Sequence, residues 1–165
     1  MANFRTGGYV HPSFFVGNMK CNNDGSIKAI YTFDQGKKLY RPLMASKIAA
    51  GFPSPAQDYV EGKLDLNEYM ISHPASTFFV RVDGYSMVGA GIMPDDILVV
   101  DRALEATSKK IVIAILDGEL TVKRLVIEDD NYYLVPESAD YPSIQIHEGM
   151  DFTIWGVVTF VIHKV

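Results

Sequence analysis

The feature that most constrains this chain is a series of β-branched and aromatic segments that recur from Thr77 onward. Each segment is short enough for one strand, and turn residues separate it from the next. Asp117-Gly118, between two apolar runs, is the strongest hairpin signal in the sequence. The segments are Thr77–Val82, Ile97–Asp101, Ile111–Leu116, Leu120–Ile127, Tyr132–Val135, Ser143–Ile146 and Phe152–Val161. They predict a mainly β domain built from antiparallel hairpins.

The residues before Thr77 carry shorter signals. Apolar residues fall at period two over Ile27–Phe33, and Leu39–Leu43 follows the turn residues as a returning second strand. Farther along, Ser54 has the sequence of an N-cap with proline at the next position, which predicts a short helix over Ser54–Glu61. Gly62 ends that helix, and Leu64–Ile71 predicts a second short one.

Charge divides the chain into two regions. Residues 1–50 contain seven Lys/Arg and two Asp/Glu, a balance of +5, whereas residues 51–165 contain eight and eighteen, a balance of −10. We therefore expect a basic N-terminal arm over 1–50 and a β-rich body over 51–165, with the boundary at Ala50–Gly51. The acidic body, and the lack of successive amphipathic helices in the arm, argue against direct DNA binding.

Cysteine, acid and hydropathy patterns exclude several classes of site. The single cysteine, Cys21, excludes an internal disulfide and a cysteine-based zinc site. The acid pairs Asp95-Asp96 and Asp129-Asp130 are expected at turns, because adjacent residues point apart and no metal-ligand spacing surrounds them. The longest apolar runs have strand length, and no signal peptide is evident. We expect a cytoplasmic protein without membrane span, metal or cofactor.

Two residues are candidates for chemistry. Ser86 follows a strand end in a glycine-rich segment, where a substrate backbone can approach and free amides can face an oxyanion. None of the four histidines lies in a known catalytic motif, so the base for Ser86 is sought elsewhere. Lys123 lies on the second strand of the predicted hairpin, where burial would lower its pKa. From these patterns alone, an ordinary turn serine and a solvent-facing lysine remain alternatives.

Three segments taken in order resemble one family. Ala50–Ala56 (AGFPSPA) is similar to the cleavage region of the UmuD and LexA proteins, and Phe79–Met87 (FVRVDGYSM) to their nucleophile segment. Asp117–Arg124 (DGELTVKR) resembles the hairpin that bears the base. The serine-to-lysine spacing of 37 residues also matches. With Leu64–Asn67 and Phe152–Val161, the resemblance to these self-cleaving serine peptidases covers roughly residues 44–165.

The resemblance implies a LexA/UmuD-type β-clip domain, with two short helices and an N-terminal arm, that forms a homodimer. It implies Ser86 as nucleophile, Lys123 as base, backbone amides of Ser86 and Met87 as oxyanion hole, and a cut at Ala50–Gly51. Family members cleave themselves when stimulated by RecA filaments on single-stranded DNA during the SOS response. In UmuD-like members the trimmed form serves a Y-family, UmuC-like polymerase in translesion synthesis.

The sequence also departs from the family pattern. Lys109-Lys110 stands where Gly-Asp is common, and the 50-residue front is longer than a UmuD arm and shorter than a LexA DNA-binding domain. A LexA-like transcriptional regulator inactivated by the same cut is therefore the alternative function, and a non-catalytic dimeric module a third. The role of residues 1–43, cleavage in cis or in trans, and the identity of the polymerase stay open.

Overall fold

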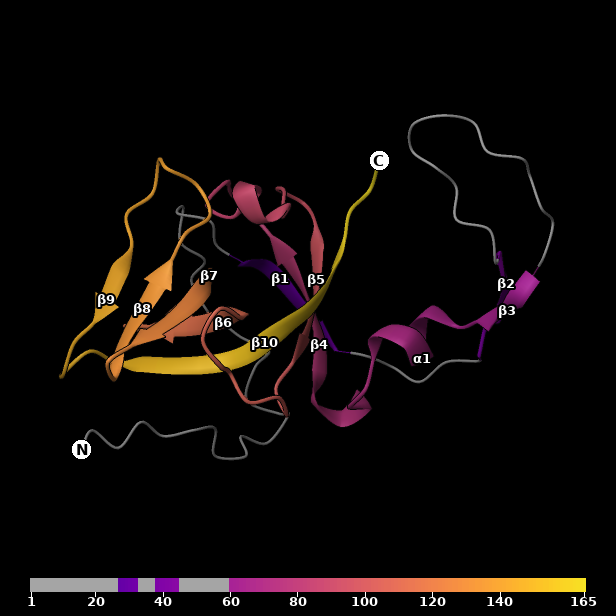
Figure 1. The fold of residues 1–165 in the computed structure, drawn as a ribbon, viewed down its shortest axis with the longest axis horizontal. Coiled ribbons are helices and arrows are strands. Elements are labelled where there is room, and N and C mark those ends of the chain that lie inside the picture. Colours follow the sequence, from indigo (N-terminus) through magenta and orange to yellow (C-terminus); the bar gives the residue numbers. More distant parts are fainter. Residues whose placement is uncertain (1–26, 33–37, 45–59) are drawn as a thin grey trace.

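A computed structural model describes residues 27–32, 38–44 and 60–165. In this part of the chain an eight-stranded antiparallel sheet has the order β1-β4-β5-β10-β6-β7-β8-β9, and β2 and β3 form a separate two-stranded sheet (Figure 1). The strands are β1 Ile27–Thr32, β2 Arg41–Met44, β3 Val60–Leu64, β4 Thr77–Val82, β5 Ile97–Asp101, β6 Ile111–Leu116, β7 Glu119–Glu128, β8 Asn131–Val135, β9 Ile144–Ile146 and β10 Phe152–Ile162. The short helices are α1 Leu66–Met70, and the 3-10 turns η2 Pro74–Ser76 and η3 Val88–Ala90.

The large sheet has buried side chains on both faces. Successive residues of a strand point to opposite sides, and in β6 Ile113 accordingly joins one apolar cluster while Val112 and Ala114 join another. The first cluster contains Ile27, Val80, Val82, Met87, Ile92, Leu98, Val100, Ile113, Leu120, Val122 and Trp155. The second contains Val112, Ala114, Leu125, Leu134, Ile146 and Val157. The β6–β7 hairpin therefore lies at the centre of the domain.

Strand β10 joins the two halves of the sheet, as the long yellow strand in Figure 1 shows. Its first half pairs with β6 and its second half with β5, with register shifts at Ile154/Gly156 and Val158/Phe160. Such bulges bend a strand and increase its twist. At Gly156 an added Cβ would lie 2.7 Å from Cγ1 of Val100, so the bend brings the backbone close to β5.

The predicted strands from Thr77 onward are confirmed to within one residue at each end. The hairpin at Asp117-Gly118 is confirmed as well, with φ of 50° and 83° at its two turn residues, as a two-residue hairpin turn requires. Asp95, Asp129 and Asp130 also have positive φ, as turn acids do. The mainly β fold of the LexA/UmuD type is thus the observed one.

The predicted pairing of the front strands is wrong. β1 pairs with β4, and β2 pairs with β3, so Ile27–Phe33 and Leu39–Leu43 do not form a hairpin with each other. The reason is burial: Ile27 inserts into the first apolar cluster beside Val82, whereas Leu43 stays exposed. Periodicity identified the strands but carries no information on which partner covers them.

The prediction that a helix extends to Glu61 is also wrong. Val60 and Glu61 belong to β3, and Gly62 lies within this strand opposite Leu43 rather than ending a helix. Pairing with β2, a contact between distant segments, overrides the local signal. Ser54 and Pro55 lie outside the described residues, as does the boundary at Ala50–Gly51. The second helix is shorter than predicted and begins after its N-cap, Asp65.

Candidate active site

Ser86 lies in the turn that follows β4. Gly84, with φ of 118°, reverses the chain there, and η3 begins two residues after Ser86. The serine side chain is 0% exposed although it sits in a loop. Its carbonyl accepts a hydrogen bond from the amide of Glu137 at 2.8 Å. The loop is therefore fastened to the segment after β8, which holds Ser86 in one place.

Lys123 lies on β7 opposite Val112, in the central hairpin, and is 2% exposed. Its Nζ donates to Oγ of Ser86 at 3.1 Å, to Oγ1 of Thr121 at 2.9 Å and to the carbonyl of Val122 at 3.2 Å. The lysine is thus oriented by two contacts on its own strand and points its amine at the serine. The fold brings together two residues that stand 37 positions apart.

Thr121 is a site residue that the sequence analysis missed. Thr121 is buried, and its hydroxyl is not an acid or base at neutral pH, so the sequence analysis did not treat it as a catalytic candidate. The available signal was its position two residues before Lys123, which places both side chains on the same face of the strand. A hydroxyl there accepts from the amine and fixes its direction.

The proposed oxyanion amides belong to Ser86 and Met87, at the turn before η3. Among the described residues, no backbone carbonyl accepts a hydrogen bond from either amide. The side chain of Met87 is buried in the first apolar cluster, and this packing anchors the turn. The predicted scissile pair Ala50–Gly51 lies outside the described residues, in the segment that connects β2 to β3.

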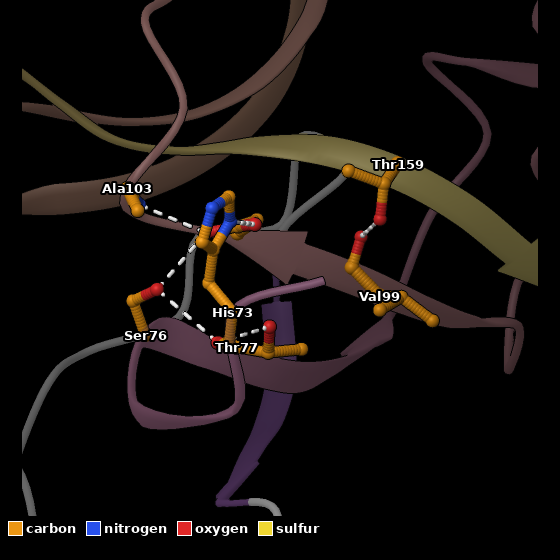
Figure 2. A network of polar contacts seen from close by, with 7 residues as sticks. His73, Ser76, Thr77, Val99, Ala103 and Thr159 are labelled. Carbon is orange, nitrogen blue, oxygen red and sulfur yellow. Dashed lines mark hydrogen bonds and ion pairs between the residues drawn. The ribbon is translucent and has the colours of Figure 1, made fainter. Parts of the chain in front are cut away.

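Two histidines of the described residues, His73 and His163, contact aspartates rather than Ser86. Nδ1 of His73 lies 2.6 Å from Oδ2 of Asp101, whose other oxygen accepts from Oγ of Ser76 at 3.1 Å and from the amide of Ala103 at 2.9 Å (Figure 2). His163 forms a similar contact with Asp96, also 2.6 Å long. Both aspartates are buried. These pairs flank β5 at its two ends and hold the segments before β4 and after β10.

The described part of the chain shows neither a metal site nor a membrane-spanning helix. It contains no group of three or more His, Cys, Asp or Glu side chains that could hold a metal ion. None of its helices is long and apolar enough to cross a membrane.

Comparison with known proteins gives the family. Residues 42–159 match the family described as Peptidase S24-like. The chain belongs to this Peptidase S24-like family. The matched range contains Ser86, Lys123 and the segment between β2 and β3. Membership supports a serine peptidase of the LexA/UmuD kind.

The chain is also similar to individual proteins of known name. The chain is 52% identical to the protein ImpA of Escherichia coli over 124 residues, which are 75% of this chain and 84% of ImpA. It is 44% identical to the protein MucA of Escherichia coli over 119 residues, 72% of this chain and 81% of MucA. The LexA repressor of Xylella fastidiosa is 36% identical over 123 residues, 74% of this chain but 58% of the repressor. These UmuD-like relatives connect this Peptidase S24-like chain with the SOS response.

Proposed function

We propose that this chain is a serine peptidase that cuts its own Ala50–Gly51 bond, with Ser86 as nucleophile and Lys123 as general base. The observation that carries the proposal is the 3.1 Å contact between Nζ of Lys123 and Oγ of Ser86, both buried. A serine hydroxyl is a weak nucleophile until an adjacent base removes its proton. A buried amine within hydrogen-bond distance meets the geometric requirement for that base.

Burial also suits the lysine to this role. Removal from water disfavours the ammonium form, which lowers the pKa of a lysine, and we expect the pKa of Lys123 to lie below that of an exposed lysine. The neutral amine accepts the proton of Ser86 as Oγ attacks the carbonyl carbon of Ala50. The resulting ammonium then protonates the amine of Gly51 as the C–N bond breaks.

The second half of the reaction uses the same groups. Water, deprotonated by Lys123, attacks the acyl ester on Ser86. The ester bond then breaks, the Lys123 ammonium returns a proton to Oγ of Ser86, and the new carboxylate of Ala50 is released. In both steps the carbonyl oxygen becomes negative, and the amides of Ser86 and Met87 are available to donate to it.

The β2–β3 pair supports the choice of scissile bond. The two strands are antiparallel, with Met44 opposite Val60, so the ends of the connecting segment are held beside each other. Ala50 and Gly51 lie in that segment, between Met44 and Val60. Small side chains at this bond suit a chain that must pass close to a buried serine. On this proposal residues 1–50 are the released arm and 51–165 the retained body, and release requires β1 to separate from β4 after the cut.

The relatives support a role in SOS mutagenesis. By analogy with UmuD-like proteins, we propose that a RecA filament on single-stranded DNA stimulates the cut. The trimmed chain then acts as a homodimeric accessory of a Y-family, UmuC-like polymerase. The coverage of ImpA and MucA, above four fifths of each, favours this role over a LexA-like regulator, of which 58% is covered. A cytoplasmic location belongs to the same proposal.

Identification of the new N-terminus tests the proposal. Purified protein is incubated with RecA, single-stranded DNA and a nucleotide, and the products are identified by mass spectrometry. We expect a fragment that begins at Gly51, and no cleavage in Ser86→Ala. Ser143→Ala, which removes an exposed serine, is the matched control and should be cut normally. A cut elsewhere, or normal cutting of Ser86→Ala, would overturn the proposal.

A further inference from the structure

A second set of contacts surrounds Ser86, and it involves neither Lys123 nor Thr121. The amide of Glu137 donates to the carbonyl of Ser86 at 2.8 Å, and the carbonyl of Glu137 accepts from the amide of Gly89 at 2.7 Å. One residue of the segment after β8 thus bonds to the turn of the nucleophile at two points. Backbone contacts of this kind fix the turn as a short strand pair would.

Gly89 allows this approach because it has no side chain. A Cβ at this position would lie 2.4 Å from the carbonyl oxygen of Glu137 and 3.3 Å from its carbonyl carbon. Real Cβ atoms do not approach a backbone oxygen so closely, so any other residue would push Glu137 away from the turn. The fit is therefore specific to glycine for a steric reason.

The side chain of Glu137 connects this turn to the strand of the base. Its Oε1 forms an ion pair with Nε of Arg124, the residue that follows Lys123 on β7. Nη1 of Arg124 also donates to the carbonyl of Lys109 at 2.6 Å. The Arg124 and Glu137 side chains are each about three tenths exposed, so the ion pair is partly shielded from water.

We propose that Glu137 is a positioning residue, which couples the Ser86 turn to the Lys123 strand through Arg124 and so sets the distance between Oγ and Nζ. The inference rests on the proposed function. Lys123 and Arg124 point to opposite faces of β7, so the ion pair acts through the backbone and not on the amine itself. Its loss should leave the base chemically unchanged but misplace the nucleophile. Small displacements of this kind cost about ten- to a hundred-fold in rate.

The test compares self-cleavage in Glu137→Ala, Glu137→Gln and Gly89→Ala across a range of pH, at a temperature where circular dichroism shows each variant folded. We expect Glu137→Ala and Gly89→Ala to lower the plateau rate about ten- to a hundred-fold without moving the pH midpoint. Glu137→Gln keeps a hydrogen-bond acceptor for Arg124 and should lose less. Glu128→Ala, an exposed acid on the same strand β7, is the control and should match the wild type.

A double variant and an exchange measurement complete the design. Arg124→Ala should match Glu137→Ala, and the double variant should be no slower than either one, because the two residues act as a unit. Independently of cleavage, hydrogen exchange of the Gly89 amide should accelerate in Glu137→Ala. Wild-type rates or unchanged exchange in Glu137→Ala, or a shifted pH midpoint, would overturn the inference. The proposed function fails separately, if the wild type is not cut or Ser86→Ala is.

Discussion

Two antiparallel strand pairs of this molecule, β6–β7 and β2–β3, differ in their connection and in their surroundings. The β6–β7 hairpin has its central side chains in both apolar clusters of the large sheet, and Val112, Val122 and Lys123 are buried there. The β2–β3 hairpin forms a sheet of its own, with Leu43 exposed, and lies apart from the large sheet in Figure 1. The first carries the proposed base, and the second carries the segment that contains the proposed scissile bond.

This difference separates the proposed catalytic residues from the proposed substrate segment. A packed sheet holds side chains in one geometry, which the proposed chemistry needs. A two-stranded hairpin is marginally stable by itself, so it depends on anchors. Anchors among the described residues include three contacts: Asp65 accepts from the amide of Leu39 at 2.6 Å, the ring of Tyr69 lies 5.4 Å from that of Phe160, and His73 contacts Asp101. The substrate segment is thus attached at a few points and can be presented to the site.

The largest expected contrast is in global stability. Leu98 is 0% exposed and Leu43 is 41% exposed. Leu98→Ala should lower the free energy of unfolding by about 3 kcal/mol, because it leaves a cavity in the first apolar cluster. Leu43→Ala should lower it by less than about 0.5 kcal/mol. Urea unfolding followed by circular dichroism measures both. Equal losses would mean that the β2–β3 hairpin is part of the cooperative core.

The same contrast explains which part of the fold was predictable. In the strands from Thr77 onward, successive side chains point to two buried faces, or the strand ends at turn residues with positive φ. Both features can be recognised from a short stretch of sequence. The β2–β3 pairing is not local: Val60–Leu64 looks like the end of a helix until Arg41–Met44 lies beside it. Where few side chains of a strand are buried, the hydrophobic pattern of its sequence does not indicate which strand it pairs with.

A smaller effect distinguishes the anchors at the two ends of β5. Asp101→Ala leaves three groups without their carboxylate acceptor, and Asp96→Ala leaves the Met93 amide and His163 without theirs. Each substitution should lower the free energy of unfolding by about 1–3 kcal/mol. Only Asp101→Ala should accelerate hydrogen exchange in α1 and η2, since His73 precedes β4. If Asp96→Ala does the same, the two pairs are not separate anchors.

The smallest effect is at Asp65 and depends on pH. The backbone amide of Leu39, and then that of Asn67, donates to this carboxylate and lowers the pKa of Asp65 below its ordinary value of 3.8. Its stabilising contribution is therefore complete above that value and is lost as the pH falls through the lowered, folded-state pKa. Asp65→Asn should speed exchange of the Leu39 amide at neutral pH by a few-fold. The difference from the wild type should vanish in acid, and a difference that persists there would contradict this account.

The site was predictable in part. Ser86 and Lys123, which lie in contact in the structure, could be predicted because each belongs to a recognisable motif and the motifs occur in the expected order. Thr121 and Glu137 were not found. Thr121 acts through a hydroxyl contact, and Glu137 through its backbone and an ion pair with Arg124. Such contacts arise from packing between distant segments, which motif spacing does not encode.

The central claim is that buried Lys123 removes the proton from Ser86, and the pH dependence of unassisted cleavage tests it most directly. The rate of Gly51 release is measured without RecA from about pH 7 to about pH 11, a range that spans the ordinary lysine pKa. Only the neutral amine accepts a proton, so the rate should rise with pH and level off above the pKa of Lys123, which we expect burial to lower. Lys123→Arg should be inactive throughout, because guanidinium keeps its proton. A plateau already reached near neutral pH, together with activity in Lys123→Arg, would show that another group is the base.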